Sequence, residues 1–172
     1  MNDNHTAENS PDATNATAEP SIYTLIGGEA IVRALVKRFY QLMDTLPAAQ
    51  GIRRMHAADL GPIEEKLVLY LTGWLGGPQL YIEKYGHPML RARHLPFPIG
   101  SSEIKQWLLC MRQALNETIT DPGIRAHIDS ALTGLALHMR NRRDDAPAAT
   151  ANPSSDQATN SATNPATDQS ST

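Results

Sequence analysis

One histidine lies where its side chain would have a fixed direction. His94 ends a segment with short helical character, and Pro96 and Pro98 follow almost at once. Because proline cannot continue a helix, the imidazole would sit between a helix end and a rigid turn. Imidazole is a usual axial ligand of haem iron. Position alone does not separate this residue from three other histidines, His87, His127 and His138. A lone histidine is also more often a surface or capping residue than a ligand.

Two aromatic side chains that carry hydrogen-bond donors lie on apolar helical faces. Tyr40 is in phase with Val32 and Val36, and Trp107 lies on the apolar stripe of a later segment. A buried phenol usually needs a partner, and an indole N–H can only donate. The plainer interpretation is a core tyrosine bonded to a backbone carbonyl and a tryptophan that packs. If both donors faced one dry cavity, they would suit a bound ligand with negative charge.

Helical spacing dominates the segments that must position these residues. Apolar residues recur at intervals of three and four, the pattern of a helix with one buried face. The pattern predicts four main helices, over roughly 28–46, from Pro62 to before Gly76, from Ser101 or Ser102 through Ile119, and from Asp121-Pro122 to about 142. It also predicts one or two short helices over 79–94, broken at 86–88. Since no alternating run indicates a strand, we expect an all-α fold.

The two ends of the chain differ from its middle. Residues 1–20 and 144–172 contain no Leu, Ile, Val, Phe, Tyr, Trp, Lys or Arg. All 15 basic residues and 10 of the 18 acidic residues lie in 21–143, which therefore carries a formal charge of +5, and each end carries −4. Segments so poor in apolar side chains cannot offset the entropy of ordering. We therefore expect disordered tails at 1–20 and 144–172 around one domain at 21–143.

Composition excludes several classes of protein. A single cysteine excludes an internal disulfide scaffold and a CxxC zinc site. No apolar run approaches the roughly 18 residues that span a bilayer, and the acidic N-terminus is unlike a secretory signal. No Lys/Arg run exceeds Arg142-Arg143, so we expect no nucleic-acid partner. HExxH, GxSxG, P-loop and dinucleotide motifs are absent. We expect a cytoplasmic protein without a membrane partner.

Several segments together resemble the group II truncated haemoglobins. They are Gly73-Trp74-Leu75-Gly76-Gly77-Pro78, Tyr85-Gly86-His87-Pro88, Leu90-Arg91-Ala92-Arg93-His94-Leu95-Pro96-Phe97-Pro98-Ile99 and Gln106-Trp107-Leu108-Leu109-Cys110-Met111, with Gly27-Gly28 and Arg38-Phe39-Tyr40 in the same order and spacing. The resemblance spans about residues 23–142. It implies an all-α truncated globin, a two-over-two helical sandwich around haem b.

The resemblance also implies roles for individual residues. His94 resembles the proximal iron ligand, and Tyr40 and Trp107 resemble the distal hydrogen-bond donors. Arg93 resembles a residue that pairs with a haem propionate, as charge complementarity favours. Three apolar residues complete the expected cofactor contacts, namely Ile63, Leu67 and Phe97.

The sequence departs from the family pattern at the distal side. His56 occupies the position where the family usually has Tyr or Phe against the haem. It would add a third polar group near the ligand, or alter ligand access and pH response. The connection from Leu46 to Gly51 is longer by about three residues than in close relatives. Ile63 at the distal entrance is apolar, so we expect no polar gate there.

The function implied is binding of O2, NO or CO at a pentacoordinate iron. Two hydrogen bonds to a charged acceptor, each worth about 1.5–3 kcal/mol, would slow O2 release by about 10²- to 10⁴-fold. Slow release suits gas sensing, scavenging or redox chemistry better than transport.

Two alternatives remain open at this point. One is a haem enzyme for NO dioxygenation or peroxidase-like detoxification, which would need an external reductase. The other is a helical interaction module without a cofactor. We expect a monomer or a weak homodimer.

Overall fold

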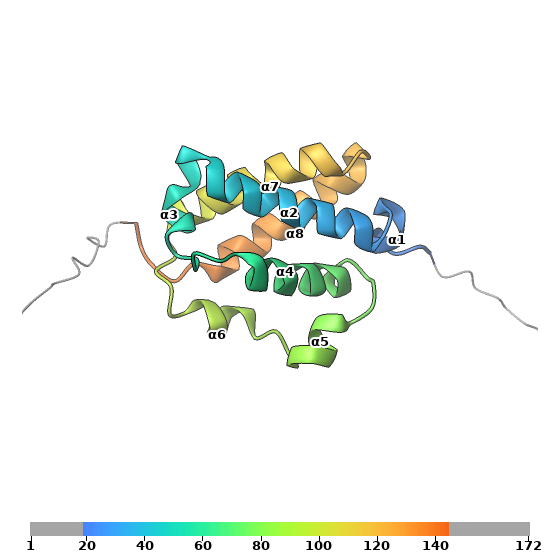
Figure 1. Ribbon diagram of the computed structural model, residues 1–172, viewed down its shortest axis with the longest axis horizontal. Helices are drawn as coiled ribbons and strands as arrows, with labels where there is room; N and C mark the ends of the chain where they lie inside the picture. Colours follow the sequence, from blue (N-terminus) through green and yellow to red (C-terminus); the bar gives the residue numbers. More distant parts are fainter. Residues whose placement is uncertain (1–18, 145–172) are drawn as a thin grey trace, which may run out of the picture.

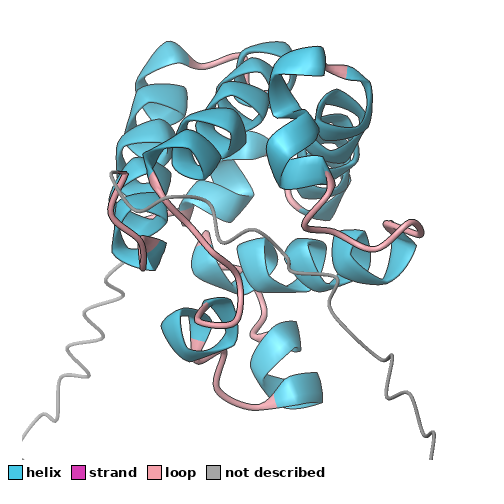
Figure 2. Cartoon of the chain, turned by 90° about the vertical axis from the view of Figure 1, so that its left-hand side faces the viewer, coloured by secondary structure: helices cyan, strands magenta, loops and turns pink. Residues whose placement is uncertain are grey.

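The computed structural model describes residues 19–144, and in that range the chain forms helices and connecting loops without strands (Figures 1 and 2). The helices are α1 Ile22–Ile26, α2 Glu29–Thr45, the 3-10 turn η1 Pro47–Ala49, α3 Gln50–Arg53, α4 Gly61–Trp74, α5 Leu80–Tyr85, α6 Leu90–His94, α7 Ser101–Thr118 and α8 Pro122–Met139. This confirms the predicted all-α class. The predicted tails lie outside the described residues, apart from positions 19, 20 and 144.

Local chemistry accounts for the bounds of the long helices. α2 ends at Leu46, whose extended backbone (φ −77°, ψ 123°) is the conformation favoured before Pro47. Pro62 lies in the first turn of α4, where a missing N–H costs nothing. Asp121 caps α8 by accepting a hydrogen bond of 2.8 Å from the backbone N–H of Ile124. The predicted long helices are therefore confirmed within a few residues of their ends.

The start of α7 is capped differently from the prediction. Ser101 and Ser102 are the residues that sequence favours as caps, yet Gly100 holds the capping position. Asp144 accepts from the backbone N–H and the hydroxyl of Ser101 at 2.9 and 2.8 Å. These hydrogen bonds lower the pKa of the Asp144 carboxyl. The cap therefore comes from a residue 43 positions away, which we had placed in the C-terminal tail.

The sequence predicts some of the short helices but not others. α5 and α6 confirm the two short helices expected over 79–94. α1, η1 and α3 were not predicted, because segments of three to five residues are too short for helical periodicity to show.

α2 is the centre of the packing. It contacts α4 on one side and α7 on another, and α7 in turn packs against α8. The side chains of α2 that face this core are Val32, Leu35, Val36, Phe39, Tyr40, Leu42 and Met43. α8 contributes Leu132, whereas the neighbouring Ala131 is exposed. α5 and α6 lie beyond α4 at the edge of the molecule (Figure 1). None of the helices in this range has the length and apolar character needed to cross a bilayer.

Candidate functional site

Three of the predicted site residues come together from three different elements. Tyr40 lies on α2, Trp107 on α7, and His56 in the loop after α3. The Phe39 ring lies 4.9 Å from that of Tyr40 and 5.3 Å from that of Trp107, between ring centroids. The Tyr40 and His56 rings are 6.0 Å apart and nearly perpendicular. The structure thus places the phenol of Tyr40 and the indole of Trp107 against the fully buried Phe39, with the His56 imidazole beside the phenol.

The two aromatic donors of this cluster have no hydrogen-bond partner among the residues that the structure describes. In the described part of the chain, the nearby hydrogen bonds belong to Ile52, His56 and Gln106, and none involves the Tyr40 hydroxyl or the Trp107 indole N–H. Burial raises the pKa of Tyr40 well above its usual value, and the negative charge of Glu64 adds to the shift. The phenol therefore stays protonated and can donate, and the alternative of a tyrosine bonded to a backbone carbonyl is not what residues 19–144 show.

The third member of the cluster has a defined orientation. Nδ1–H of His56 donates to the carbonyl of Ile52 at 2.8 Å. Since a carbonyl can only accept, the proton of the neutral ring is on Nδ1. Nε2 then carries a lone pair, so neutral His56 offers an acceptor beside Tyr40.

His94 belongs to a separate group of contacts at the end of α6. Its Nδ1–H donates to the carbonyl of Leu90 at 2.7 Å, and the ring is half-buried. This bond fixes both the ring direction and the tautomer, and it leaves the Nε2 lone pair free to bind a metal.

The turn after His94 is fastened to the end of α8. Nδ2 of Asn141 donates to the carbonyls of His94 and Phe97 at 3.0 and 2.8 Å. Its Oδ1 accepts from the backbone N–H of Ile99 at 2.9 Å. The guanidinium of Arg91 also donates to the carbonyls at the end of α8. Each of these contacts joins residues more than 40 positions apart, so the position of α6 depends on α8.

Apolar side chains on α4 and after α6 are left partly uncovered. One face of α4 packs into the core through Val68 and Leu71. On other positions of the helix, Leu67 is half-buried and Ile63 is 38 % exposed. Beyond His94, Phe97 is 42 % exposed. Single exposed apolar side chains are ordinary on protein surfaces, so these residues are compatible with a contact to a bound group but do not by themselves mark a groove.

A cavity of about 260 Å³ adjoins the same part of the fold. It lies between α4, α5 and the segment that leads into α6, and its lining residues include Tyr70, Trp74, Tyr81 and His87. The space is lined mainly by aromatic and apolar groups, and none of the site residues predicted from the sequence is among them.

Comparisons with known proteins agree with this architecture. The bacterial-like globin family matches residues 21–141. The group 2 truncated hemoglobin YjbI of Bacillus subtilis is 39% identical over 117 residues, which cover 68% of this chain and 86% of that protein. A solved group II 2-on-2 hemoglobin of Agrobacterium tumefaciens is 50% identical with a TM-score of 0.72, covering 75% of this chain and 99% of its own. A truncated oxygen-avid haemoglobin of Bacillus subtilis is 39% identical with a TM-score of 0.65, covering 71% and 100%.

The helical sandwich of α2, α4, α7 and α8 is the fold of a truncated globin. The chain belongs to the bacterial-like globin family, in which its relatives are group 2 truncated haemoglobins. Membership implies haem binding and globin-type binding of diatomic ligands.

The side chains present fit a haem group. One imidazole has its Nδ1–H satisfied and its Nε2 free, and apolar residues of α4 and of the turn after α6 remain uncovered. Two donors that have no partner in residues 19–144 lie on α2 and α7. Arg93 is exposed beside His94, where a guanidinium can meet a carboxylate.

Sequence reasoning missed the residues that hold these groups in place. These hydrogen bonds run to backbone carbonyls from the side chains of Arg53, Arg91 and Asn141. The carbonyls that accept from Arg91 and Asn141 are distant from them in sequence. Every residue has a backbone carbonyl, so the amino-acid sequence does not show which carbonyl accepts a hydrogen bond. No spacing pattern could therefore have predicted these contacts.

Proposed function

We propose that the chain is a haem b protein that binds O2, and also NO and CO, and releases O2 slowly. In this proposal His94 is the single protein ligand of the iron. Tyr40 and Trp107 are the hydrogen-bond donors on the opposite side, and His56 is a third polar group there. Ile63, Leu67 and Phe97 contact the porphyrin, and Arg93 pairs with a propionate.

The observation that carries the proposal is the pair of unused donors. The Tyr40 hydroxyl lies on a side chain that is 5 % exposed, and neither it nor the Trp107 N–H has a partner within residues 19–144. In residues 19–144, Thr72 Oγ1 is the one enclosed side-chain N or O atom without a partner, so the Tyr40 hydroxyl and the Trp107 N–H both keep an accessible surface that a ligand can reach. A ligand with negative charge would satisfy both donors.

When bound, haem would supply an iron with an open position for a diatomic gas. The protein's own residues set how such a ligand is held. His94 presents Nε2 because Leu90 holds its other nitrogen. The raised pKa of Tyr40 keeps its proton available for donation. The indole of Trp107 donates at every pH. Two donors on one ligand with negative charge favour slow release, in keeping with the oxygen-avid relative of Bacillus subtilis.

A second candidate function is redox detoxification of NO or peroxide. One observation favours it, because neutral His56 places a proton acceptor beside the donor Tyr40. A positioned imidazole that can take and return a proton is a common general base and acid. This function would require an external reductase, and steady-state turnover in the presence of one would distinguish it from ligand storage.

Two substitutions test the main proposal. Replacing His94 with Ala should abolish or strongly shift the haem Soret band, whereas His127→Ala, at an exposed position on α8, should leave it unchanged. Trp107→Phe should speed O2 dissociation by about 10-fold or more, the loss of one hydrogen bond to a charged acceptor. An unchanged Soret band in His94→Ala would overturn the ligand assignment. An unchanged dissociation rate in Trp107→Phe would mean that the indole N–H points elsewhere.

A further inference from the structure

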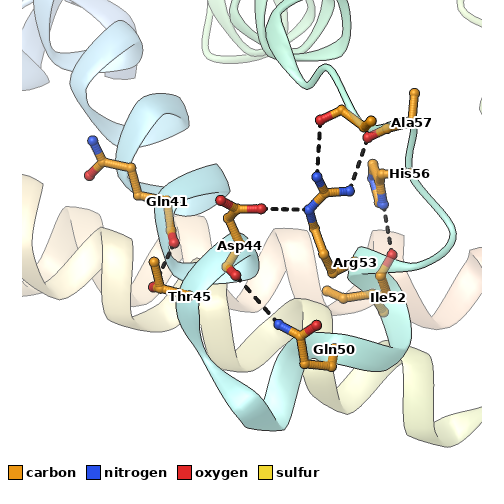
Figure 3. A network of polar contacts seen from close by, with 9 residues as sticks. Gln41, Asp44, Thr45, Gln50, Ile52, Arg53, His56 and Ala57 are labelled. Atoms are coloured by element: carbon orange, nitrogen blue, oxygen red, sulfur yellow. Dashed lines mark hydrogen bonds and ion pairs between the residues drawn. The ribbon is translucent and has the colours of Figure 1, made fainter.

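All three guanidinium nitrogens of Arg53 donate hydrogen bonds, and these bonds hold the loop that carries His56 (Figure 3). Nε donates to the carboxylate of Asp44 at 2.7 Å. Nη1 and Nη2 donate to the carbonyls of Ala57 and Ala58 at 2.9 and 3.0 Å. The side chain of Arg53 is only 19 % exposed. A planar fork that holds three acceptors at once leaves the loop little freedom.

The three acceptors come from two segments, the loop that follows His56 and the part of α2 that follows Tyr40. Ala57 and Ala58 directly follow His56, and Asp44 lies on α2, four residues after Tyr40. Residues four apart are neighbours on a helix surface. Arg53 therefore ties the loop after His56 to the same stretch of α2 that presents Tyr40, whose ring is 6.0 Å from that of His56.

A second anchor holds the other end of the same segment. Oε1 of Gln106 accepts from the backbone N–H of Ile52 at 3.0 Å, and Gln106 directly precedes Trp107 on α7. Gly51 makes room for this contact, because a Cβ there would come within 2.5 Å of Gln106 Oε1. The segment that carries His56 is thus fixed to α7 before the histidine and to α2 after it.

These contacts decide what the imidazole can do. Ile52, which Gln106 holds, provides the carbonyl that accepts the Nδ1–H of His56. As long as the segment keeps this shape, Nε2 is the free nitrogen of the ring. If the loop moved, the ring would lose both its direction and its fixed tautomer.

We propose that Arg53 is the positioning residue for His56, holding the imidazole against Tyr40 with Nε2 as its free nitrogen. This inference rests on the proposed function, in which His56 lies beside the bound ligand. Arg53 itself touches neither ligand nor haem in this proposal, and it acts only through the histidine. Its effect on the ligand should therefore disappear when His56 is removed.

A double-mutant cycle tests this dependence. Arg53→Met keeps most of the side chain's length and removes its N–H groups. It should change the O2 dissociation rate about 2- to 10-fold, the scale of one ordinary hydrogen bond, and in the same direction as His56→Phe. The C–O stretching frequency of the CO-loaded protein should move in the same direction in both variants. In the His56→Phe background, Arg53→Met should leave the rate unchanged.

The controls separate a positioning role from a general structural one. Arg54→Met changes an exposed neighbour, for which no side-chain hydrogen bond is seen in residues 19–144, and should leave rate and frequency unchanged. If Arg53→Met folds poorly, Arg53→Lys replaces it in the test. Lysine keeps the charge but cannot reach all three acceptors, so the O2 dissociation rate should change in the same direction by a smaller factor. Two results would overturn the proposal: an equal change of the O2 dissociation rate by Arg53→Met with His56 present and with Phe at position 56, or no change by Arg53→Met in the otherwise unaltered protein.

Hydrogen exchange gives a second readout that does not depend on ligand release. In the haem-loaded protein, Arg53→Met should speed amide exchange in residues 55–60, and Arg54→Met should not. If Tyr40→Phe and Trp107→Phe leave O2 release unchanged, the proposed function fails while this measurement still reports on the loop. If those two variants act as expected and Arg53→Met leaves exchange unchanged, only the positioning role fails.

Discussion

The hydroxyl of Thr72 is a buried polar group that the fold leaves unsatisfied. The residue is 1 % exposed on α4, and Oγ1 has no hydrogen-bond partner in the described part of the chain. A buried hydroxyl without a partner costs free energy, and a methyl group of similar size would not. Thr72→Val should therefore raise the free energy of unfolding by about 1 kcal/mol, measured by urea denaturation.

A second threonine supplies the matched comparison. Thr118 is half-buried near the end of α7, and its hydroxyl donates to the carbonyl of Ala114 at 2.8 Å. Thr118→Val removes a hydrogen bond that is made, so it should be neutral or destabilising. Opposite signs for the two substitutions would support the assignment. A loss of stability in Thr72→Val would show that its hydroxyl has a partner after all.

The sequence identified individual residues better than their partners. The positions of Tyr40 and Trp107 on apolar faces follow from spacing alone, and both are part of the cluster seen in the structure. Cys110 is fully buried, and burial raises its pKa to about 11, as expected for an inert core thiol. Phe39, which lies between the two donors, looked like an ordinary core residue. Its place in the cluster depends on the packing of α2 against α7, which no local pattern encodes.

At the scale of elements, the attachment of α6 to α8 can be tested at Asn141. Asn141→Ala removes two donated hydrogen bonds and one accepted hydrogen bond, all to backbone groups between His94 and Ile99. Because those backbone groups would lose their partners, we expect a loss of about 2 kcal/mol in the free energy of unfolding. Amide exchange at residues 94–99 should also become faster.

Asn116 provides the control for this prediction. It is exposed on α7, and no side-chain hydrogen bond of Asn116 is seen in residues 19–144. Asn116→Ala should change stability by less than about 0.5 kcal/mol, as surface substitutions usually do. If Asn141→Ala behaved in the same way, α6 would be held by its apolar contacts rather than by this side chain.

The sequence predicts the long helices better than the short ones. α2, α4, α7 and α8 each span 14 or more residues, which is long enough for a repeated apolar face and for Pro or Asp signals at their ends. α1 and α3 have five and four residues, and tertiary contacts such as that of Ile52 with Gln106 hold α3 in place. The loop with His56 follows α3, so the part of the site that depends on short elements was the least predictable.

At the scale of the whole molecule, three ion pairs within residues 19–144 join the four long helices to one another at the surface. Arg33 with Glu65 links α2 to α4, and Arg38 with Glu117 links α2 to α7. Arg112 with Asp129 links α7 to α8. All of these side chains are a third or more exposed, so each pair contributes little to stability. The sandwich is therefore held together mainly by the apolar core around α2.

That core implies that the terminal segments outside 19–144 are dispensable for folding. They contain neither aliphatic residues larger than alanine, other than Met1, nor aromatic residues. We predict that a chain of residues 19–144 keeps its Soret band and a Tm within about 2 °C of the full chain, since segments of this composition have little apolar surface to bury. Its formal charge changes from −3 to +3, because all 15 basic but only 12 of the 18 acidic residues remain. At pH 7 it should bind a cation exchanger, whereas the full chain should bind an anion exchanger.

The position of the cut at the C-terminal end gives this experiment its sharpest control. Asp144 caps α7 through Ser101, so a chain that ends at 143 loses a cap that a chain ending at 144 keeps. Loss of a capping side chain costs about 1 kcal/mol, so the shorter chain should unfold at a lower temperature. Ser101→Ala in the chain ending at 144 would remove the hydroxyl contact alone and should have a smaller effect. Equal Tm values for chains ending at 143 and 144 would show that the cap contributes nothing. A large fall in Tm for both, relative to the full chain, would show that the removed segments pack against the domain.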